Sequence, residues 1–591
     1  MDAITKKAFK GHICSLSEVI KKYRTNQASL IGTVLHAWCF ESYPHLSQSS
    51  LPVNKKLMSD SRVIAFLNML KNLPFLDAAY RLSTAYALLS ENTYRKSLAL
   101  YFTPPSLTER LLTDLETQGI SFNKGRFFDP ACGGAAFIAP IALRMKDALK
   151  AQGASPSKIL IHIEKNLYGM DVDIALCALS EQFLKIALYS EIKTVKREPS
   201  FRILTGNSLC DLEDFNNTVD VLICNPPYRK INKNDINNYR TPFKEVIEGQ
   251  PNMYGLFIAL SIKLLKPNGL CSLVTPTSFL SGRYFSKLRD FIMKESHILN
   301  IGIVSDRSGV FIDVLQETAL TLLKRIKRVH LSDIKARVSL VSRDGNCVDV
   351  GNCMLPNSGA AWPIPRIESD VILLKKSAES EFRIRDYGYE IRIGSFVWNR
   401  DKRPVFMSAK ELSRKNIKTA VPLLWSSDIK NMGILKFDGT EKKNGEPCFV
   451  DYGDKSHCSI IRRNSVILQR VTSNDQPRRL IASVVSNEFI KKYGGFVGEN
   501  HTVILEKIVT KPVLTANKMA KLLNGYMADR YFRSISGATN VSVFELKQLP
   551  LPDPGLLKHH LDNNKSMDIA SILAVFGNSE IPVEIQNELR T

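Results

Sequence analysis

The sequence predicts an α/β protein whose central region forms a mixed, mostly parallel sheet with helices on both faces. Between residues 96 and 330, short apolar runs alternate with amphipathic stretches, as expected for strands that alternate with helices. Small or polar residues follow several of these runs, at the positions where open α/β sheets bind their ligands. The flanking regions have other patterns, so we expect a helical N-terminal extension before the sheet and an α+β C-terminal domain after it.

Residues 1–95 predict the helical extension. Apolar residues recur at helical spacing in 16–23, 61–73 and 76–90. The first twelve residues are polar and basic with no apolar run behind them, so we expect no signal peptide. We find no combination of catalytic residue types in this extension, and no run of about 18 apolar residues that would indicate a membrane span.

The central region, residues 96–330, contains the apolar runs that predict the strands of the sheet. They are 125–128, 166–170, 201–204, 219–224, 269–274, 299–303 and 317–323. The proline-containing residues 331–390 predict a connecting segment or a small sheet. Residues 391–556, where short strands alternate with turn signals before a helix over 518–533, predict the separate α+β domain. Residues 557–591 predict a polar C-terminal tail.

The composition favours a polyanionic partner and a reducing compartment. The 591 residues carry a formal net charge of +22, and both halves of the chain are basic. A basic cleft between domains explains this excess, and a generally basic surface is the alternative. The 11 cysteines form no C-x-x-C pairs, so we expect free thiols in the cytoplasm. No ligand spacing indicates a metal site.

A run of small residues follows the first predicted strand. Residues 127–137 read Phe-Phe-Asp-Pro-Ala-Cys-Gly-Gly-Ala-Ala-Phe and then open a helix. Small residues let the backbone approach a ligand, and a helix N-terminus offers free N–H donors. The run lacks the spacing of G-x-G-x-x-G and the Lys-Ser/Thr of a P-loop, which argues against a nucleoside triphosphate. A tightly packed strand–helix turn without a ligand is the alternative.

The next two predicted strands also end in polar residues. Asp171 stands where an acid of a doubly wound sheet accepts hydrogen bonds from ribose hydroxyls. It is alternatively the N-cap of the helix that starts near Ile174, a role that Asp173 fills equally well. Asn207 follows the third strand, where its side chain is placed to bind an adenine edge. With the small-residue loop, these residues predict a nucleoside site.

The fourth strand leads into Asn225-Pro226-Pro227-Tyr228, which predicts a site for a planar amine. Two prolines exclude a helix and leave backbone carbonyls without local donors. An amide, a free carbonyl and an aromatic ring therefore stand together, as two acceptors for an NH₂ group and one ring to stack on it. The alternative is a strand that ends in a proline-stiffened turn with no role in binding.

The order of these motifs resembles the gamma group of S-adenosyl-L-methionine-dependent adenine-N6 DNA methyltransferases, the TaqI methyltransferase type. The resemblance covers residues 96–330, including Tyr101-Phe102-Thr103-Pro104-Pro105 and 252–257, and continues weakly into the C-terminal domain. It implies a Rossmann-like methyltransferase fold, S-adenosyl-L-methionine as the methyl donor, and a target-recognition domain for DNA in 391–556. Asn207 departs from the pattern, because the family usually has Asp there.

The resemblance also implies site residues. Those for the cofactor are Thr103, Asp129, Ala131, Gly133, Asp171, Val172, Asn207 and Ser208. Those for catalysis are Asn225, Pro226, Pro227, Tyr228 and Phe311. The target adenine leaves the duplex, Tyr228 and Phe311 stack on its two faces, and direct methyl transfer follows while Asn225 Oδ1 and the Pro226 carbonyl hold the amine.

Basic residues in two segments are candidates for DNA contacts. They are Arg229 and Lys230 in a predicted polar loop over 229–240, and Arg462, Arg463, Arg470, Arg478 and Arg479 in the C-terminal domain. Arginine binds phosphates and guanine edges alike. A solvated surface loop is an equally good explanation of residues 229–240.

These inferences predict a cytoplasmic, monomeric, site-specific modification enzyme of a type II restriction-modification system. It acts on double-stranded DNA without a membrane and without a stable complex with its separately encoded restriction endonuclease. A modification subunit of a multi-subunit restriction system is the main alternative. Protein-glutamine methyltransferases, which share Asn-Pro-Pro-Tyr, and RNA base methyltransferases are the others.

Overall fold

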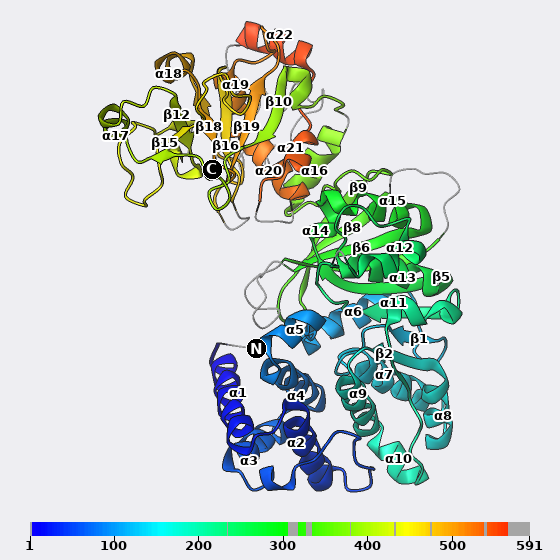
Figure 1. Ribbon diagram of the computed structural model, residues 1–591. Coiled ribbons are helices and arrows are strands. Elements are labelled where there is room, and N and C mark those ends of the chain that lie inside the picture. Colours follow the sequence, from blue (N-terminus) through cyan, green and yellow to red (C-terminus); the bar gives the residue numbers. More distant parts are fainter. Residues whose placement is uncertain are drawn as a thin grey trace. The chain divides into compact units, whose positions relative to one another are not determined.

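The computed structural model describes residues 3–232, 234–304, 317–326, 334–378, 380–430, 433–472, 476–536 and 540–564 (Figure 1). The chain forms two compact units. The first contains residues 1–279, 284–349 and 356–359, and the second contains residues 280–283, 350–355 and 360–591. No helix among the described residues is long and apolar enough to cross a membrane.

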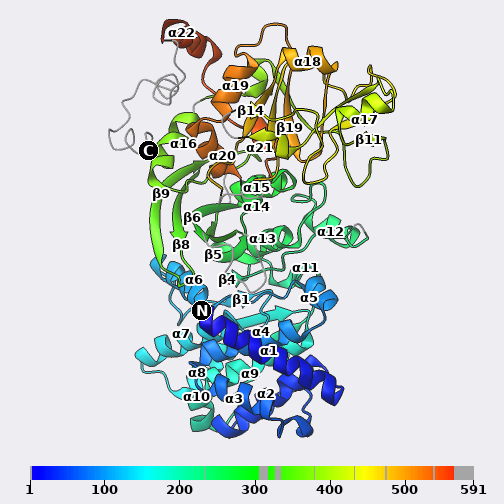
Figure 2. The same ribbon diagram turned by 90° about the vertical axis from the view of Figure 1, so that its left-hand side faces the viewer.

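The first unit begins with helices, as the sequence predicts. They are α1 (Ala3–Tyr23), α2 (Gln27–Ser42), α3 (Ser61–Lys71), α4 (Phe75–Leu89) and α5 (Asn92–Leu98). Asn26 and Asp60 cap α2 and α3 by accepting hydrogen bonds from backbone N–H groups. The rings of Phe75 on α4 and Phe183 on α9 (Ile174–Ala187) meet edge to face with centroids 6.3 Å apart. The N-terminal helices therefore share a core with the helices of the central region, beside which they lie in Figures 1 and 2.

The main sheet has nine strands in the order β3-β2-β1-β4-β5-β7-β6-β8-β9. They are β1 (Phe127–Asp129), β2 (Leu167–Asp171), β3 (Arg202–Thr205), β4 (Val219–Cys224), β5 (Leu265–Pro276), β6 (Ser296–Val304), β7 (Thr318–Arg325), β8 (Ile334–Val341) and β9 (Cys347–Leu355). Neighbouring strands are parallel along the run β3-β2-β1-β4-β5. Strand β7 is antiparallel to both β5 and β6. The strand order reverses between β1 and β4, which creates a crevice at their carboxyl ends. The predicted mixed α/β fold is confirmed.

Further helices and short helical turns lie before and between the strands of the main sheet. The helices are α6 (Pro105–Thr117), α7 (Ile138–Ala151), α8 (Pro156–Asn166), α9, α10 (Tyr189–Val195), α11 (Ser208–Asp211), α12 (Ile236–Phe243), α13 (Met253–Leu264), α14 (Ser278–Ser281) and α15 (Ser286–Glu295). The 3₁₀ turns are η1 (Lys55–Leu57), η2 (Glu213–Phe215) and η3 (Arg283–Phe285). Helix α12 begins inside the segment 229–240, so the prediction of a polar loop there is wrong for its last residues.

Strands β8 and β9 lie beyond residue 330, where the sequence predicted a connecting segment or small sheet. Strand β8 is parallel to β6 and therefore extends the main sheet. Its first residues alternate between buried and exposed. That alternation is typical of a strand with one covered face, and differs from the continuous apolar runs that mark buried parallel strands. The central fold is therefore longer than its apolar runs indicate.

The second unit is built on small sheets, with orders β10-β19-β16-β17, β11-β15-β12-β18 and β13-β14. Its strands are β10 (Tyr389–Ile393), β11 (Val405–Phe406), β12 (Ala420–Leu424), β13 (Ile429–Lys430), β14 (Ile434–Leu435), β15 (Phe449–Asp451), β16 (Ser465–Gln469), β17 (Ala482–Val485), β18 (Val497–Gly498) and β19 (Thr502–Lys507). Its helices are α16 (Glu368–Ala378), α17 (Ala409–Arg414), α18 (Asn487–Tyr493), α19 (Ala516–Leu523), α20 (Tyr526–Ile535), α21 (Val543–Lys547) and α22 (Pro554–Asn564), with turns η4 (Ile384–Tyr387) and η5 (Ser426–Asp428).

The helix predicted over 518–533 is wrong, because α19 and α20 are separate helices. The Asn524 side chain, between them, accepts a hydrogen bond from Ala482 N and donates one to Ala482 O, both at 2.8 Å. This pairing with β17 fixes the chain after α19. A tertiary contact thus overrides the helical spacing of the sequence.

Candidate active site

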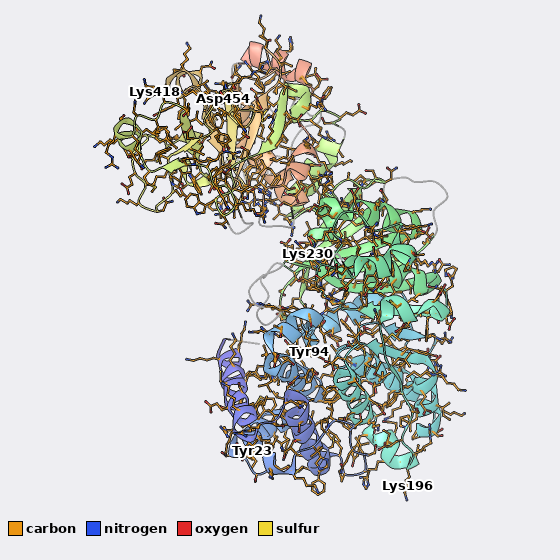
Figure 3. All side chains as sticks on the ribbon, in the orientation of Figure 1. Tyr23, Tyr94, Lys196, Lys230, Lys418 and Asp454 are labelled. Atoms are coloured by element: carbon orange, nitrogen blue, oxygen red, sulfur yellow. The ribbon has the colours of Figure 1, made fainter. Side chains whose placement is uncertain are left out.

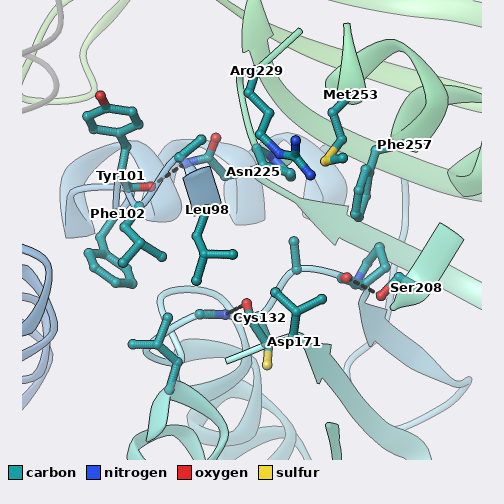
Figure 4. A pocket seen from close by; sticks show the side chains of 18 of the residues that line it. Leu98, Tyr101, Phe102, Cys132, Asp171, Ser208, Asn225, Arg229, Met253 and Phe257 are labelled. Carbon is teal, nitrogen blue, oxygen red and sulfur yellow. Dashed lines mark hydrogen bonds between the residues drawn. The ribbon is translucent and has the colours of Figure 1, made fainter. Parts of the chain in front are cut away.

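The loops after β1 to β4 enclose a cavity of about 230 Å³ in the first unit (Figure 4). Its lining residues come from these loops, from residues 97–103 and from α13. They include Leu98, Tyr101, Thr103, Ala131, Gly133, Asp171, Val172, Asn207, Ser208, Asn225, Pro227, Arg229, Tyr239, Met253 and Phe257. Most residues predicted to bind a nucleoside or an amine thus surround one space, as expected when parallel strands end at the same edge of a sheet.

The small-residue loop after β1 is held by neighbours on three sides. The Gly133 N–H donates to Asp171 Oδ2 at 3.0 Å, and the Gly133 carbonyl accepts from Ser180 Oγ at 2.6 Å. A Cβ atom at Gly134 would collide with Ser83 of α4. Glycine at position 134 is therefore required for the close approach of α4 to this loop.

Asp171 faces the cavity, and the neighbouring Asp173 is the helix cap. Asp173 Oδ1 accepts from the N–H groups of Ala175 and Leu176, at 2.9 and 3.3 Å. Asp171 accepts instead from Gly133 N and, at 2.9 Å, from Asp173 N. Burial raises the pKa of Asp171 to about 6. The N-cap alternative for Asp171 is thus wrong, and its carboxylate is available to a ligand in the cavity.

Two tyrosines of the N-terminal helices hold Asp173. The hydroxyls of Tyr86 and Tyr94 donate to Asp173 Oδ2 at 2.9 and 3.0 Å. Tyr94, labelled in Figure 3, belongs to α5, and the residues that follow this helix line the cavity. Sequence reasoning found no role for residues 1–95, because nothing in a helical pattern indicates which distant strand end a tyrosine will reach.

Asp129 is fully buried and is not one of the residues that line the cavity. Its Oδ1 accepts from Ala131 N at 3.0 Å. Burial raises the pKa of this carboxyl well above its ordinary value, and the charge of Asp171 acts in the same direction. Asp129 thus supports the small-residue loop after β1, whereas Ala131 lines the cavity.

The third strand end carries Asn207 and Ser208. Asn207 Oδ1 caps the short helix α11 by accepting from Leu209 N at 3.2 Å, and Asn207 Nδ2 lies 3.3 Å from the Tyr239 hydroxyl. Ser208 Oγ donates to the Pro130 carbonyl at 2.5 Å and so joins the loops after β1 and β3. Asn207 lines the cavity, but part of its hydrogen-bonding capacity is already used within the protein.

The amide of Asn225 is oriented by the motif that precedes α6. Its Nδ2 donates to the Tyr101 carbonyl at 3.1 Å and to Thr103 Oγ1 at 3.0 Å. With both amide hydrogens used, Oδ1 is left as the acceptor. This is the orientation that binding of a substrate amine requires.

The Tyr228 hydroxyl lies between two acceptors. It is 2.7 Å from Asn225 Oδ1 and 3.0 Å from the Val274 carbonyl. Burial raises the pKa of Tyr228 well above its ordinary value, so the hydroxyl stays protonated. Its hydrogen points to one acceptor at a time, and turning to Val274 releases Asn225 Oδ1.

The basic candidates differ in their surroundings. Arg229 lines the cavity beside Asn225 and Met253 (Figure 4), whereas Lys230 is exposed. Phe311, the second predicted stacking ring, lies outside the described residues. Its predicted role therefore rests on the resemblance alone.

The five arginines of the C-terminal domain do not form one surface. Arg462 and Arg463 are exposed before β16, while Arg470 follows the other end of this strand. Arg478 donates to the Asn524 carbonyl at 2.9 Å. Arg479 is fully buried and donates to Ser536 Oγ at 2.9 Å, so its prediction as a DNA-contact residue is wrong. Its guanidinium group binds inside the second unit and is not accessible to DNA.

The fold and the strand-end cavity define an α/β protein with a nucleoside-sized site beside an amide acceptor. Residues 134–311, which contain most of this site, match the family model for the Eco57I restriction-modification methylase. The central segment is therefore similar to methylases of restriction-modification systems.

Particular relatives agree with this class. The chain is 24% identical over 359 residues to the type II methyltransferase M.PstI of Providencia stuartii, covering 58% of this chain and 66% of that protein. It is also 24% identical over 346 residues to M.BsuBI of Bacillus subtilis, covering 57% and 65%. The matches thus span slightly less than two thirds of these relatives.

A solved structure shows the same fold over nearly the whole chain. The type IIL restriction-modification enzyme MmeI, solved in complex with DNA, aligns with a TM-score of 0.57. The alignment covers 97% of this chain and 92% of that one, at 12% sequence identity. At this identity, the likeness concerns the fold.

Proposed function

We propose that the chain is a site-specific DNA methyltransferase of the gamma group, which transfers a methyl group from S-adenosyl-L-methionine to N6 of an adenine flipped out of duplex DNA. The hydrogen-bonded orientation of Asn225 carries this proposal. Its amide nitrogen is bound to Tyr101 and Thr103, which leaves its oxygen, 2.7 Å from the Tyr228 hydroxyl, as the acceptor for a substrate amine beside the cavity.

The residues around the cavity fit this methyl donor. Asp171 offers a carboxylate to ribose hydroxyls, and apolar Val172 and Phe257 line the space that a purine ring requires. Gly133 keeps the backbone close without a side chain in the way. When bound, S-adenosyl-L-methionine supplies an electrophilic methyl group.

The protein's part in the reaction is to position the target amine. The Asn225 oxygen and the Pro226 carbonyl accept its two hydrogens, which turns the nitrogen lone pair away from the ring and toward the methyl donor. Tyr228 stays protonated, with Val274 as the second acceptor for its hydroxyl. The amine loses one proton to solvent after methyl transfer, because an amide is no base at neutral pH.

The remaining features complete the proposal. Residues 391–556 recognise double-stranded DNA, and the enzyme works in the cytoplasm as a monomer beside a separately encoded restriction endonuclease. The match to type II methyltransferases favours this over a subunit of a multi-subunit system. A glutamine amide and an RNA base also present a planar NH₂ to Asn225, so the substrate class needs a direct test.

The test is to incubate the purified chain with S-adenosyl-L-methionine labelled in its methyl group and with duplex DNA, RNA or protein. We expect label in DNA, on adenine N6, at one recurring sequence. Label in RNA or protein alone would assign the enzyme to the corresponding alternative. Activity that requires a second subunit would assign it to a multi-subunit system.

A further inference from the structure

The second unit holds a half-exposed tryptophan on a rigid aromatic support. Trp398, in the loop after β10, is 47% exposed. Its ring meets Trp425 edge to face at 5.7 Å between centroids, and Phe396 at 6.4 Å. Phe396 and Trp425 are buried. An apolar ring fixed from below and open above loses little conformational entropy when a partner covers it.

Cations follow this tryptophan along the same loop. Arg400, Lys402 and Arg403 are exposed, and with Ser395 and Val397 they line a shallow depression. Arg403 lies over the Tyr452 ring, 4.2 Å from its centroid, and pairs with Asp401 at 2.6 Å. The loop thus combines one fixed cation with two solvent-facing cations beside the aromatic ring.

A second segment extends this surface. Asn500 N donates to the Phe396 carbonyl at 2.8 Å. This bond joins the segment before β19 to the loop after β10 that carries Trp398, which we call the tryptophan loop. Arg470 donates from Nη1 to the Asn500 carbonyl at 2.8 Å, and the half-exposed His501 contacts Glu499 Oε2 at 3.0 Å. The end of β16 that carries Arg470 therefore lies at the tryptophan loop.

We propose that residues 398–403, with Arg470 and His501, form the surface through which the second unit contacts DNA. We call it the Trp398 surface, and the inference rests on the proposed function. Trp398 packs on sugars or base edges, and Arg400 and Lys402 contact phosphates. A flat exposed ring beside solvent-facing cations suits DNA, which offers charged phosphates together with apolar sugar and base edges.

The opposite end of β16 is the competing surface. Arg462 is bound through its guanidinium to the carbonyls of Ile460 and His457, at 3.1 and 3.2 Å, and Arg463 to the carbonyl of Lys507, at 3.2 Å. These arginines satisfy backbone carbonyls of their own fold. We therefore expect Arg462 and Arg463 to couple more weakly to DNA than Arg400 and Lys402, the solvent-facing cations on which the Trp398 surface depends.

The experiment measures DNA affinity of the full chain by anisotropy of a labelled mixed-sequence duplex over a range of salt. We expect Arg400→Ala/Lys402→Ala to weaken binding about tenfold and to reduce the slope of log Kd against log salt by about 2, one unit for each phosphate that the variant no longer neutralises. Trp398→Ala should weaken binding with the slope unchanged. The matched control is Lys491→Ala/Lys492→Ala, which removes two exposed charges from α18 and should change affinity less than twofold.

Two results would overturn the inference. Equal losses in the loop variant and the lysine control would show a diffuse charge effect, and a larger loss in Arg462→Ala/Arg463→Ala would place the DNA-binding surface at the other end of β16. Both leave methylation of DNA by the unsubstituted chain intact, and with it the proposed function. A chain that methylates no DNA and binds none would remove both the inference and the proposed function.

Discussion

The ends of the central strands and the arginine-rich stretch 462–479 show opposite relations between sequence and space. Asp171, Asn207 and Asn225 are far apart in the sequence, yet they line one cavity. The arginines lie close together in the sequence, yet one pair precedes β16, Arg470 follows it, and Arg479 is buried. Proximity along the chain is therefore a poor guide to a site, whereas position on the fold is a good one.

The geometry of strands explains the difference. Parallel strands all end at one edge of a sheet, so residues that follow them meet whatever their spacing. In β16 each residue advances the chain by about 3.3 Å and side chains alternate between faces. Residues before and after such a strand are thus held apart. Substitutions at residues that the fold brings together or holds apart test this explanation.

Asn225→Asp should have the largest effect. It replaces the amide nitrogen that donates to Tyr101 and Thr103 with an oxygen, which repels the Tyr101 carbonyl and turns the acceptor away from the amine. We expect kcat for methyl transfer to fall at least about 100-fold, as when one positioned hydrogen bond to a transition state is removed. Single-turnover kinetics measure this, and calorimetry should show nearly unchanged cofactor affinity. A near-normal rate would contradict the acceptor role.

Arg479→Ala should unfold the second unit more readily. The substitution leaves a buried space beside Phe532 and removes the donor to Ser536. We expect the free energy of unfolding to drop by about 3 kcal/mol. Arg462→Ala, at an exposed position, should cost less than about 0.5 kcal/mol. Denaturant titration compares the two, and similar losses would contradict the distinction between structural and exposed arginines.

The sequence predicted the sheet and the strand-end residues because both depend on local pattern. Apolar runs mark buried strands, and Asn225-Pro226-Pro227-Tyr228 marks a turn that cannot be helical. The sequence favoured ribose binding by Asp171 and left open whether Asp171 or Asp173 caps the helix, since both precede it closely. Which of the two aspartates caps the helix depends on Gly133, because its N–H donates to Asp171 in the folded protein.

Other features depend on contacts that no local pattern reveals. The break between α19 and α20 follows from the pairing of Asn524 with Ala482. The burial of Arg479 depends on which helix covers it, because an arginine in a basic stretch looks the same whether exposed or buried. The exposure of Trp398 has no signal in the sequence, because a single tryptophan followed by basic residues looks the same whether its ring is buried or exposed.

Asp171 should make cofactor affinity depend on pH. Its pKa is raised to about 6 by burial, so the carboxylate is ionised at pH 7.5 and mostly protonated at pH 5. If ribose hydroxyls bind the ionised form, affinity falls as pH falls through 6, by about tenfold at pH 5. Asp171→Asn should bind about tenfold more weakly at pH 7.5 and show little of this dependence. Calorimetry at several pH values measures the cofactor affinity of both proteins. Equal pH profiles of the unsubstituted protein and Asp171→Asn would argue against ribose binding by Asp171.

Tyr94→Phe and Tyr86→Phe should have the smallest effect, and they test whether the N-terminal helices belong to the site. Each removes a hydroxyl that donates to Asp173 Oδ2, and Asp173 N donates to Asp171 Oδ1. A hydrogen bond contributes about 1 kcal/mol, and these hydroxyls act on the cofactor only through Asp173 and Asp171, so each change should weaken cofactor binding by at most about fivefold. The double variant should lose less than the product of the two, because both hydroxyls share one acceptor atom. Tyr80→Phe on α4 is the matched control and should leave cofactor affinity unchanged. Unchanged affinity in all three variants would confine these helices to the core, whereas the expected losses would make them a wall of the cofactor site.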